Sequence, residues 1–212
     1  DKVISLFNRN REIQVEQGCE REKTVVAPNG INVQKFKDIP LKDEDDKYIN
    51  VGALVRVVPI KDIKTMIQSF AVVKEEVPEA RFYIMGPVEE DPEYYEECMQ
   101  MVDALNVNDV VFTGSVNIKE YLGRMDLMVL TSISEAQPLA ILEGMACKKP
   151  FVTTDVGNCR EMIYGNNDDY GVAGMVVSVM DYEKIGQAVI KLCKDEKLRN
   201  EMGVNGFNRV SS

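Results

Sequence analysis

From Tyr48 onward, the chain alternates between short apolar runs and longer segments in which apolar residues recur at helical spacing. The apolar runs predict strands at residues 49–57, 81–85, 110–113, 127–130, 151–154 and 174–177. The longer segments predict helices at 62–77, 91–105, 118–125, 159–164, 181–194 and 195–209, and one more that Pro138 opens and Lys148-Lys149-Pro150 ends. Continuously apolar strands that alternate with helices are typical of a parallel sheet buried on both faces. The pattern therefore predicts an α/β fold in which helices cover both faces of a parallel sheet.

The first 47 residues differ from this pattern. Residues 1–36 hold two short strand candidates, at 3–6 and 24–27, and a helix candidate at 9–18, which is too little to bury a core. We expect this segment to pack on another domain. Residues 37–47 form an acidic connector in which Asp43 to Asp46 are expected to be solvated, and the main domain is expected to span residues 48–212.

Composition excludes several classes of function. The 212 residues carry a net charge of −10, which argues against a general nucleic-acid or membrane-surface binder. No apolar run approaches the ~20 residues of a membrane span, and no signal-peptide pattern is present. The five cysteines lack a Cys-x-x-Cys spacing, which predicts reduced thiols and a cytoplasmic protein. Histidine, the commonest general base and metal ligand, is absent, and no other cluster suggests a metal site.

The predicted strands end in loops with unusual residues, and in a parallel sheet these loops meet at one edge, where ligands bind. They are residues 55–62, 86–87, 114–115, 132–137 and 155–158. Arg56 and Lys61 lie in the first loop and make a local positive spot in an acidic protein. Either residue alone is best interpreted as an ordinary surface cation. Together on a binding edge, opposite a helix start, they favour phosphate contact.

Two glutamates, Glu135 and Glu143, flank the start of the helix that Pro138 opens. A helix N-terminus offers unpaired N–H groups to an anion, and carboxylates accept hydrogen bonds from sugar hydroxyls. This chemistry suits a ligand with a charged centre and hydroxyls on both sides, such as a nucleotide sugar. For the glutamate pair alone, solvated helix-start residues are the better interpretation.

The glycines that end the predicted strands leave two interpretations open. Gly86, Gly114 and Gly157 either provide turns or allow the backbone to approach a ligand closely. The chain also lacks G-x-G-x-x-G, a glycine-loop lysine of the Walker type, and a nucleophile with a histidine partner. Those classes of nucleotide-binding and hydrolytic site are therefore not predicted.

Four groups of residues carry a resemblance to a known family. They are Glu135-AQPLAIL-Glu143, Arg56-VVPI-Lys61, residues 153–157 (TTDVG) and residues 28–32 (PNGIN). Together they resemble the nucleotide-sugar-binding half of a family 4 glycosyltransferase of the GT-B fold, which has Rossmann-like domains. The resemblance covers nearly the whole chain. Within that family, residues 55–62 and 86–98 resemble the transferase of Pel-type exopolysaccharide synthesis, which is associated with UDP-glucose.

The resemblance implies retaining transfer of a hexose to a glycan acceptor, without a metal or other cofactor. Arg56 and Lys61 would stabilise the leaving diphosphate, Glu135 would contact the donor sugar, and Glu143 would bind the ribose hydroxyls. The remaining donor contacts would come from the loops beside them: Gly86, Gly114, Ser115, Val116 and Asn117 on one side, and Ala136, Gln137, Pro138 and Leu139 on the other. Ala136 stands where the family usually has glycine and would narrow the space for the sugar. Gln137 replaces a common aromatic residue.

The resemblance also implies that a partner half is needed. A whole GT-B enzyme reacts in the cleft between two Rossmann-like domains. This chain would hold the second domain, and residues 1–36 would be the end of a missing N-terminal domain that carries the acceptor site. We therefore expect little transfer by this chain alone. Two alternatives stay open at this point: a non-catalytic nucleotide-binding module that regulates a partner, and an interaction domain without a ligand.

Overall fold

The computed structural model describes residues 1–166 and 168–212. Two groups of strands and helices follow one another along the chain. The first comprises β1 (Val3–Ser5), α1 (Asn8–Glu16) and β2 (Thr24–Val26). The second comprises β3 (Ile49–Leu54), α2 (Ile63–Glu76), β4 (Ala80–Met85), α3 (Pro92–Ala104), β5 (Val110–Gly114), α4 (Ile118–Leu122), β6 (Leu127–Leu130), α5 (Leu139–Ala146), β7 (Phe151–Thr154), α6 (Cys159–Tyr164), β8 (Gly174–Val177), α7 (Tyr182–Lys194) and α8 (Glu196–Ser211). Short 3₁₀ helices lie at Arg21–Lys23, Val33–Phe36 and Pro59–Lys61.

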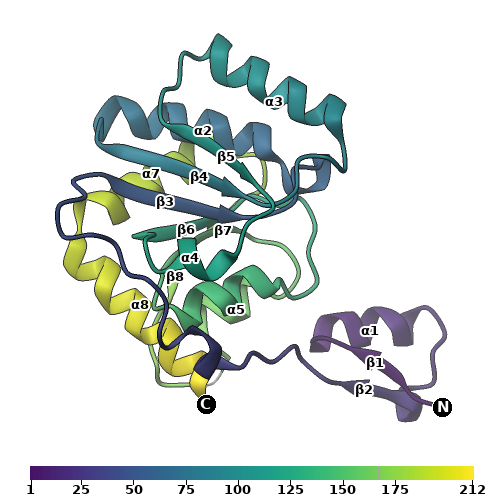
Figure 1. Ribbon diagram of the computed structural model, residues 1–212. Coiled ribbons are helices and arrows are strands. Elements are labelled where there is room, and N and C mark those ends of the chain that lie inside the picture. The colour runs from purple at the N-terminus through teal and green to yellow at the C-terminus, as the bar shows by residue number, and fades with distance from the viewer. Residues whose placement is uncertain (167) are drawn as a thin grey trace.

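The second group forms a six-stranded parallel sheet in the order β5-β4-β3-β6-β7-β8. Helices α2, α3 and α7 lie on one side of it, and α4, α5 and α8 lie on the other (Figure 1). The predicted fold class, a parallel sheet with helices on both faces, is confirmed. The chain builds outward from β3 to β5, then crosses back to β6 and builds in the opposite direction. The carboxyl ends of β3 and β6 therefore form a topological switch point, which is where such sheets bind ligands.

The core explains why the sheet and its helices keep this arrangement. Phe70 of α2 stacks on Phe82 of β4 with ring centroids 4.8 Å apart, and both rings are almost fully buried. On the other face, Gly144 lets α5 lie close on the sheet, because a Cβ there would come within 2.7 Å of Cζ of Phe151. This close packing holds the C-terminal half of α5 against the start of β7.

The first group lies apart from the larger one. Strands β1 and β2 pair in parallel, α1 packs against them, and one stretch of chain leads from β2 to the main body (Figure 1). Phe36 is buried in the core of the larger group, and Ile31 and Val33 pack against that core. Residues 27–30 are therefore the connection between the two groups. The domain boundary at residue 36 stays a prediction.

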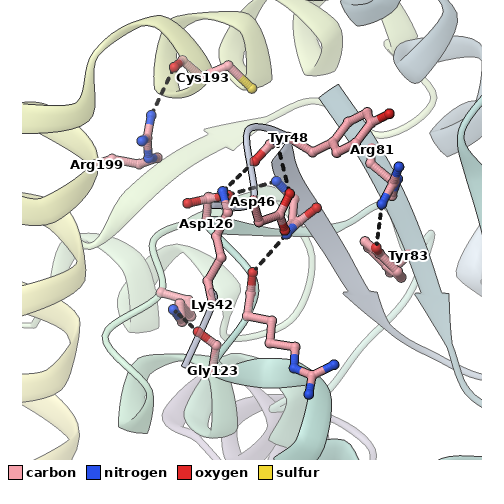
Figure 2. A network of polar contacts seen from close by, with 12 residues as sticks. Lys42, Asp46, Tyr48, Arg81, Tyr83, Gly123, Asp126, Cys193 and Arg199 are labelled. Carbon is pink, nitrogen blue, oxygen red and sulfur yellow. Dashed lines mark hydrogen bonds and ion pairs between the residues drawn. The ribbon is translucent and has the colours of Figure 1, made fainter. Parts of the chain in front are cut away.

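A polar network fastens the acidic connector to the edge of the sheet opposite the switch point (Figure 2). Lys42 pairs with Asp126 at 2.8 Å, and the same carboxylate accepts the backbone N–H of Asn50 at 2.7 Å. Asp43 to Asp45 are exposed as expected. Asp46 is only partly exposed, and its carboxylate accepts a hydrogen bond of 2.8 Å from the side chain of Asn50.

The helices of the described residues, 1–166 and 168–212, are too short or too polar to span a membrane, since none combines the length and the apolar character that crossing a bilayer requires.

Candidate functional site

A hollow of about 490 Å³ opens at the carboxyl ends of β3 and β6, and we call it the crevice. Two basic residues, two glutamates and the start of α5 meet there. Its lining residues are Asn29, Leu54, Val55, Arg56, Lys61, Leu130, Glu135, Gln137, Pro138, Leu139, Ala140 and Glu143. The residues predicted to grip a phosphate and those predicted to contact sugar hydroxyls therefore face one space.

Lys61 and Glu135 form an ion pair inside the crevice. Their Nζ and Oε1 atoms are 2.5 Å apart, and the two side chains are only 17% and 12% exposed. The hydroxyl of Ser132 donates to the same Oε1 at 2.7 Å. Within the described residues, no hydrogen bond reaches Oε2 of Glu135. This oxygen is therefore available to accept a hydrogen bond from a ligand hydroxyl.

The backbone around Lys61 is fixed from the neighbouring strand end. The hydroxyl of Thr131 donates to the carbonyl oxygens of Lys61 and Asp62, at 2.9 and 3.0 Å. Asp62 adopts a left-handed conformation with φ of 50°, and its side chain accepts the N–H of Thr65, so the predicted N-cap of α2 is confirmed. These bonds hold the end of the 3₁₀ turn against β6. The backbone that carries the Lys61 side chain is consequently held in place.

Arg56 lies at the mouth of the crevice and is held differently. Its guanidinium pairs with Glu90 at 2.7 Å, and both side chains are about half exposed. Exposed ion pairs of this kind are worth only ~0–1 kcal/mol. A phosphate offers a guanidinium two oxygens at once and can replace the Glu90 carboxylate.

The start of α5 differs by one residue from the prediction. Pro138 was expected as the first helical residue, but its ψ of 124° is extended, and it caps a helix that begins at Leu139. Pro138 has no N–H, so the predicted amide donors at residues 136–139 reduce to Ala136, Gln137 and Leu139. The first N–H groups of a helix have no partner within it, and those of α5 start in the lining of the crevice.

Glu143 lies one turn into α5 and lines the same hollow. It makes no hydrogen bond or ion pair with any described residue. Burial raises the pKa of its carboxyl group. A half-buried acceptor without a partner is costly to ionise, and a ligand hydroxyl at this position would satisfy it.

The loop before α5 is held by the loop after β7. A Cβ on Gly157, where φ is 52°, would lie 2.5 Å from the carbonyl oxygen of Ala136 and nearer still to that of Glu135. The N–H of Asn158 donates to the Ala136 carbonyl at 2.8 Å. Gly157 therefore allows a close backbone approach, but to another loop of the protein, and its approach to a ligand stays a prediction.

The other two glycines differ in their surroundings. Gly86 has a φ of 152°, and a Cβ there would lie 2.7 Å from the carbonyl carbon of Val55, so its close approach is also to the protein backbone. Gly114 has a φ of 65° with nothing within 4 Å of a Cβ, which fits a turn, and the approach of either glycine to a ligand stays a prediction.

A smaller hollow of about 180 Å³ adjoins the crevice and shares Leu54 with it. Its other lining residues are Met85, Gly86, Pro87, Ser115, Val116 and Ile118. Three of the residues predicted to contact the donor, Gly86, Ser115 and Val116, are thus brought together. Gly114 and Asn117 are not in this lining, and the Asn117 side chain instead caps α4 and donates to Glu120.

Sequence reasoning missed two residues of the site. Ser132 orients Glu135, and the signal for it was a polar residue placed two positions after a buried strand at the ligand edge. Asn29 lines the crevice and bonds Gln137, although residues 28–32 had contributed only to the family resemblance and no role was predicted for Asn29. Across the part of the chain that the structure describes, no group of three or more potential His, Cys, Asp or Glu ligands is placed to hold a metal.

Comparison with known proteins identifies the family. The profile described as "Glycosyl transferases group 1" matches residues 32–209. The N-acetyl-alpha-D-glucosaminyl L-malate synthase of Bacillus anthracis is 34% identical over 205 residues, which cover 96% of this chain and 50% of that enzyme. The capsular polysaccharide biosynthesis glycosyltransferase CapM of Staphylococcus aureus is 25% identical, over 99% of this chain and 56% of its own length.

A solved structure shows the same fold. HepE of Anabaena in complex with UDP-glucose superposes with a TM-score of 0.83 at 21% identity, over 99% of this chain and 58% of that one. The chain thus spans about half the length of the relatives it matches. On the family profile and the 34% identity, the chain belongs to the group 1 glycosyl transferases.

Proposed function

We propose that this chain is the donor-binding part of a retaining glycosyltransferase that transfers a hexose from a nucleotide sugar to a glycan acceptor. The observation that carries the proposal is the crevice, where Arg56, Lys61, Glu135 and Glu143 line one hollow together with the start of α5. This hollow lies at the carboxyl ends of β3 and β6, where parallel sheets bind ligands. A diphosphate flanked by a ribose and a hexose matches this combination of cations, helix N–H groups and carboxylates.

In this mechanism, Arg56 and Lys61 neutralise the charge that grows on the diphosphate as the bond to the sugar breaks, which is electrostatic catalysis. Glu135 is fixed by Lys61 and Ser132 through one oxygen, so its other oxygen contacts the donor sugar. The unpartnered Glu143 accepts the ribose hydroxyls. Because Arg56 and Lys61 supply the charged donors to the diphosphate, the proposed reaction is independent of a metal ion and uses no other cofactor.

UDP-glucose is the donor that we propose. The smaller hollow, with Ser115 and Val116 at its wall, adjoins the crevice where a base attached to the ribose would reach. HepE, which shares the fold, was solved with UDP-glucose bound. We also propose a role in exopolysaccharide synthesis of the Pel type and a cytoplasmic location. Both rest on the sequence alone.

The proposal includes a partner half that supplies the acceptor site. The relatives are about twice as long as this chain. Strands β1 and β2 also expose Val3, Ile4 and Val25, which are 39%, 64% and 42% accessible. A small sheet with an exposed apolar face is a surface on which further strands or helices can pack. We expect weak or no sugar transfer until that half is supplied.

Isothermal titration calorimetry with UDP, GDP and ADP tests the proposal. We expect UDP binding, and a loss of about 100-fold or more when Arg56→Ala and Lys61→Ala are combined, because two charge-assisted contacts disappear. Lys64→Ala is the matched control, since that lysine pairs with Glu97 outside the crevice. If no nucleotide binds, the proposal is wrong.

A second experiment separates an enzyme from a nucleotide-binding regulatory module, the alternative that shares the same crevice. The partner half of a relative is added in trans or fused, and glucose release or transfer from UDP-glucose is followed. Turnover that depends on Glu135 supports the enzyme. Tight UDP binding with no turnover under any of these conditions favours the regulatory module.

A further inference from the structure

Two hydrogen bonds join the connection between the two parts of the molecule to the loop that precedes α5. The backbone N–H of Asn29 donates to Oε1 of Gln137 at 2.6 Å, and the Asn29 side-chain amide donates to the Gln137 carbonyl oxygen at 3.0 Å. We call this pair of bonds the clasp. It links residues 108 positions apart, and it fixes both the side chain and the peptide group of Gln137.

The other residues of the loop are held from different directions. Lys61 and Ser132 bind the Glu135 carboxylate, and Asn158 binds the Ala136 carbonyl. Gln137 completes the set, and its hydrogen bonds to described residues both go to Asn29. The clasp therefore supplies the hydrogen bonds of Gln137, for which the described residues of the main body provide none.

Asn29 also lies in the short segment that joins the two parts of the molecule. Residues 27–30 run from β2 to the main body, and the β1–α1–β2 group lies beyond them (Figure 1). Ile31 already packs against the main core, so any rotation of that group must be taken up next to Asn29. Such a rotation would displace the Asn29 peptide and stretch the bond to Oε1 of Gln137.

We propose that Asn29 is a positioning residue that sets the conformation of residues 136–139 through Gln137 and couples it to the orientation of residues 1–27. The inference rests on the proposed function only in naming a nucleotide sugar as the ligand of that loop. A ligand that requires the clasped loop favours one orientation of residues 1–27. By linkage, that orientation favours the ligand to the same extent.

The alternatives are that Asn29 only fastens the connecting chain, or that it touches the ligand directly. Fastening alone would alter the mobility of residues 1–27 and leave ligand affinity unchanged. If Asn29 touched the ligand directly, the loss of affinity caused by replacing Asn29 would add to the loss caused by removing the Gln137 side-chain acceptor. Positioning through Gln137 predicts that the two effects do not add.

The experiment compares Asn29→Ala, Gln137→Met and the double variant with the whole chain by calorimetry with UDP-glucose. We expect each single variant to bind about three- to tenfold more weakly, because each loses one of the two hydrogen bonds of the clasp and the loss of either bond releases the loop. The double variant should then be no weaker than the worse single one. Asn32→Ala is the control, since that exposed asparagine lies in the same segment and caps only the 3₁₀ helix at Val33–Phe36. Its affinity should equal that of the unmodified chain.

Hydrogen exchange measured by mass spectrometry gives a readout that needs no ligand. We expect Asn29→Ala to speed exchange in peptides covering residues 136–139, and Asn32→Ala to leave it unchanged. Unchanged exchange in Asn29→Ala, or additive losses of affinity in the double variant, would overturn the inference. If UDP-glucose does not bind at all, the proposed function fails, and exchange alone then decides whether Asn29 positions the loop.

Discussion

Replacing Gly157 by alanine tests whether the close approach of two loops sets the geometry of the crevice. The backbone at Gly157 has a φ of 52°, and forcing an L-residue into this region costs ~1–2 kcal/mol. The added Cβ would lie 2.5 Å from the Ala136 carbonyl oxygen, whereas real Cβ contacts stay above 3.0 Å, so that oxygen must retreat by about 0.5 Å. The retreat strains the 2.8 Å hydrogen bond from Asn158, a bond worth ~1 kcal/mol.

These contributions predict a loss of about 2–4 kcal/mol in the free energy of unfolding, measured by urea denaturation. Gly114→Ala is the matched control for stability, because Gly114 also has a positive φ, of 65°, but has nothing within 4 Å of a Cβ. It should lose only the ~1–2 kcal/mol of backbone strain. The difference between the two variants isolates the contact between the loops.

The same displacement should weaken UDP-glucose binding. A shift of about 1 Å in a positioned group can cost 100-fold, so a shift of half that size predicts about a tenfold loss for Gly157→Ala. The reasoning is refuted if Gly157→Ala and Gly114→Ala destabilise the chain equally and Gly157→Ala binds UDP-glucose as the unmodified chain does. In that case the carbonyls of residues 135 and 136 would not be set by the loop after β7.

Two further predictions follow from charges in and beside the crevice. Glu90→Gln should tighten UDP binding about two- to fivefold in calorimetry, because it frees Arg56 from an exposed ion pair; Glu89→Gln, which leaves that pair intact, should not. Burial raises the pKa of Glu143, so its ionised form destabilises the fold above the raised pKa and this cost disappears below the ordinary value of 4.5. Glu143→Gln should therefore raise the urea midpoint at pH 7 but not at pH 4, and a midpoint that is lowered at pH 7 would contradict this.

Several strands of the sheet could be predicted because the residue types at their ends mark where each strand begins and stops. Strands β6, β7 and β8 have the predicted bounds, since each is an apolar run bounded by polar residues, glycine or proline. Strand β3 ends at Leu54, three residues before the predicted end. Val55 and Val57 are buried, but they hydrogen-bond Met85 and Pro87 in an irregular segment beyond the strand. An apolar run shows that residues are buried, and it does not show whether a buried backbone is still a strand.

Contacts between distant segments account for the remaining differences. Helix α4 was predicted to reach residue 125 but ends at Leu122. At the next position, Gly123, a Cβ would lie 3.0 Å from the carbonyl carbon of Pro40, so the acidic connector packs directly on the end of this helix. Such a contact depends on the path of a segment more than 80 positions away. No local pattern around residue 123 carries that information.

At the candidate site, the sequence predicted which residues carry the chemistry but not which residues they contact. The residue types at Arg56, Lys61, Glu135 and Glu143 could be selected from the sequence, because cations and carboxylates at the ligand edge of a parallel sheet are informative in themselves. Their partners could not be predicted. Lys61 meets Glu135 across 74 positions, and Arg56 meets Glu90 across 34, and only the assembled sheet brings these pairs together.

The charge balance of the crevice explains why loop geometry should decide ligand affinity. Arg56 and Lys61 are each paired with a carboxylate, and Glu143 adds a third negative group, so the crevice offers an anion no excess of positive charge. A diphosphate must therefore be held by directed hydrogen bonds from the guanidinium, the ammonium and the amides at the start of α5, whose strength falls steeply with misalignment. Those amides belong to the loop that Gly157 approaches and that Asn29 clasps. Residues that never touch the phosphate can then control its binding, because they fix the directions in which its donors point.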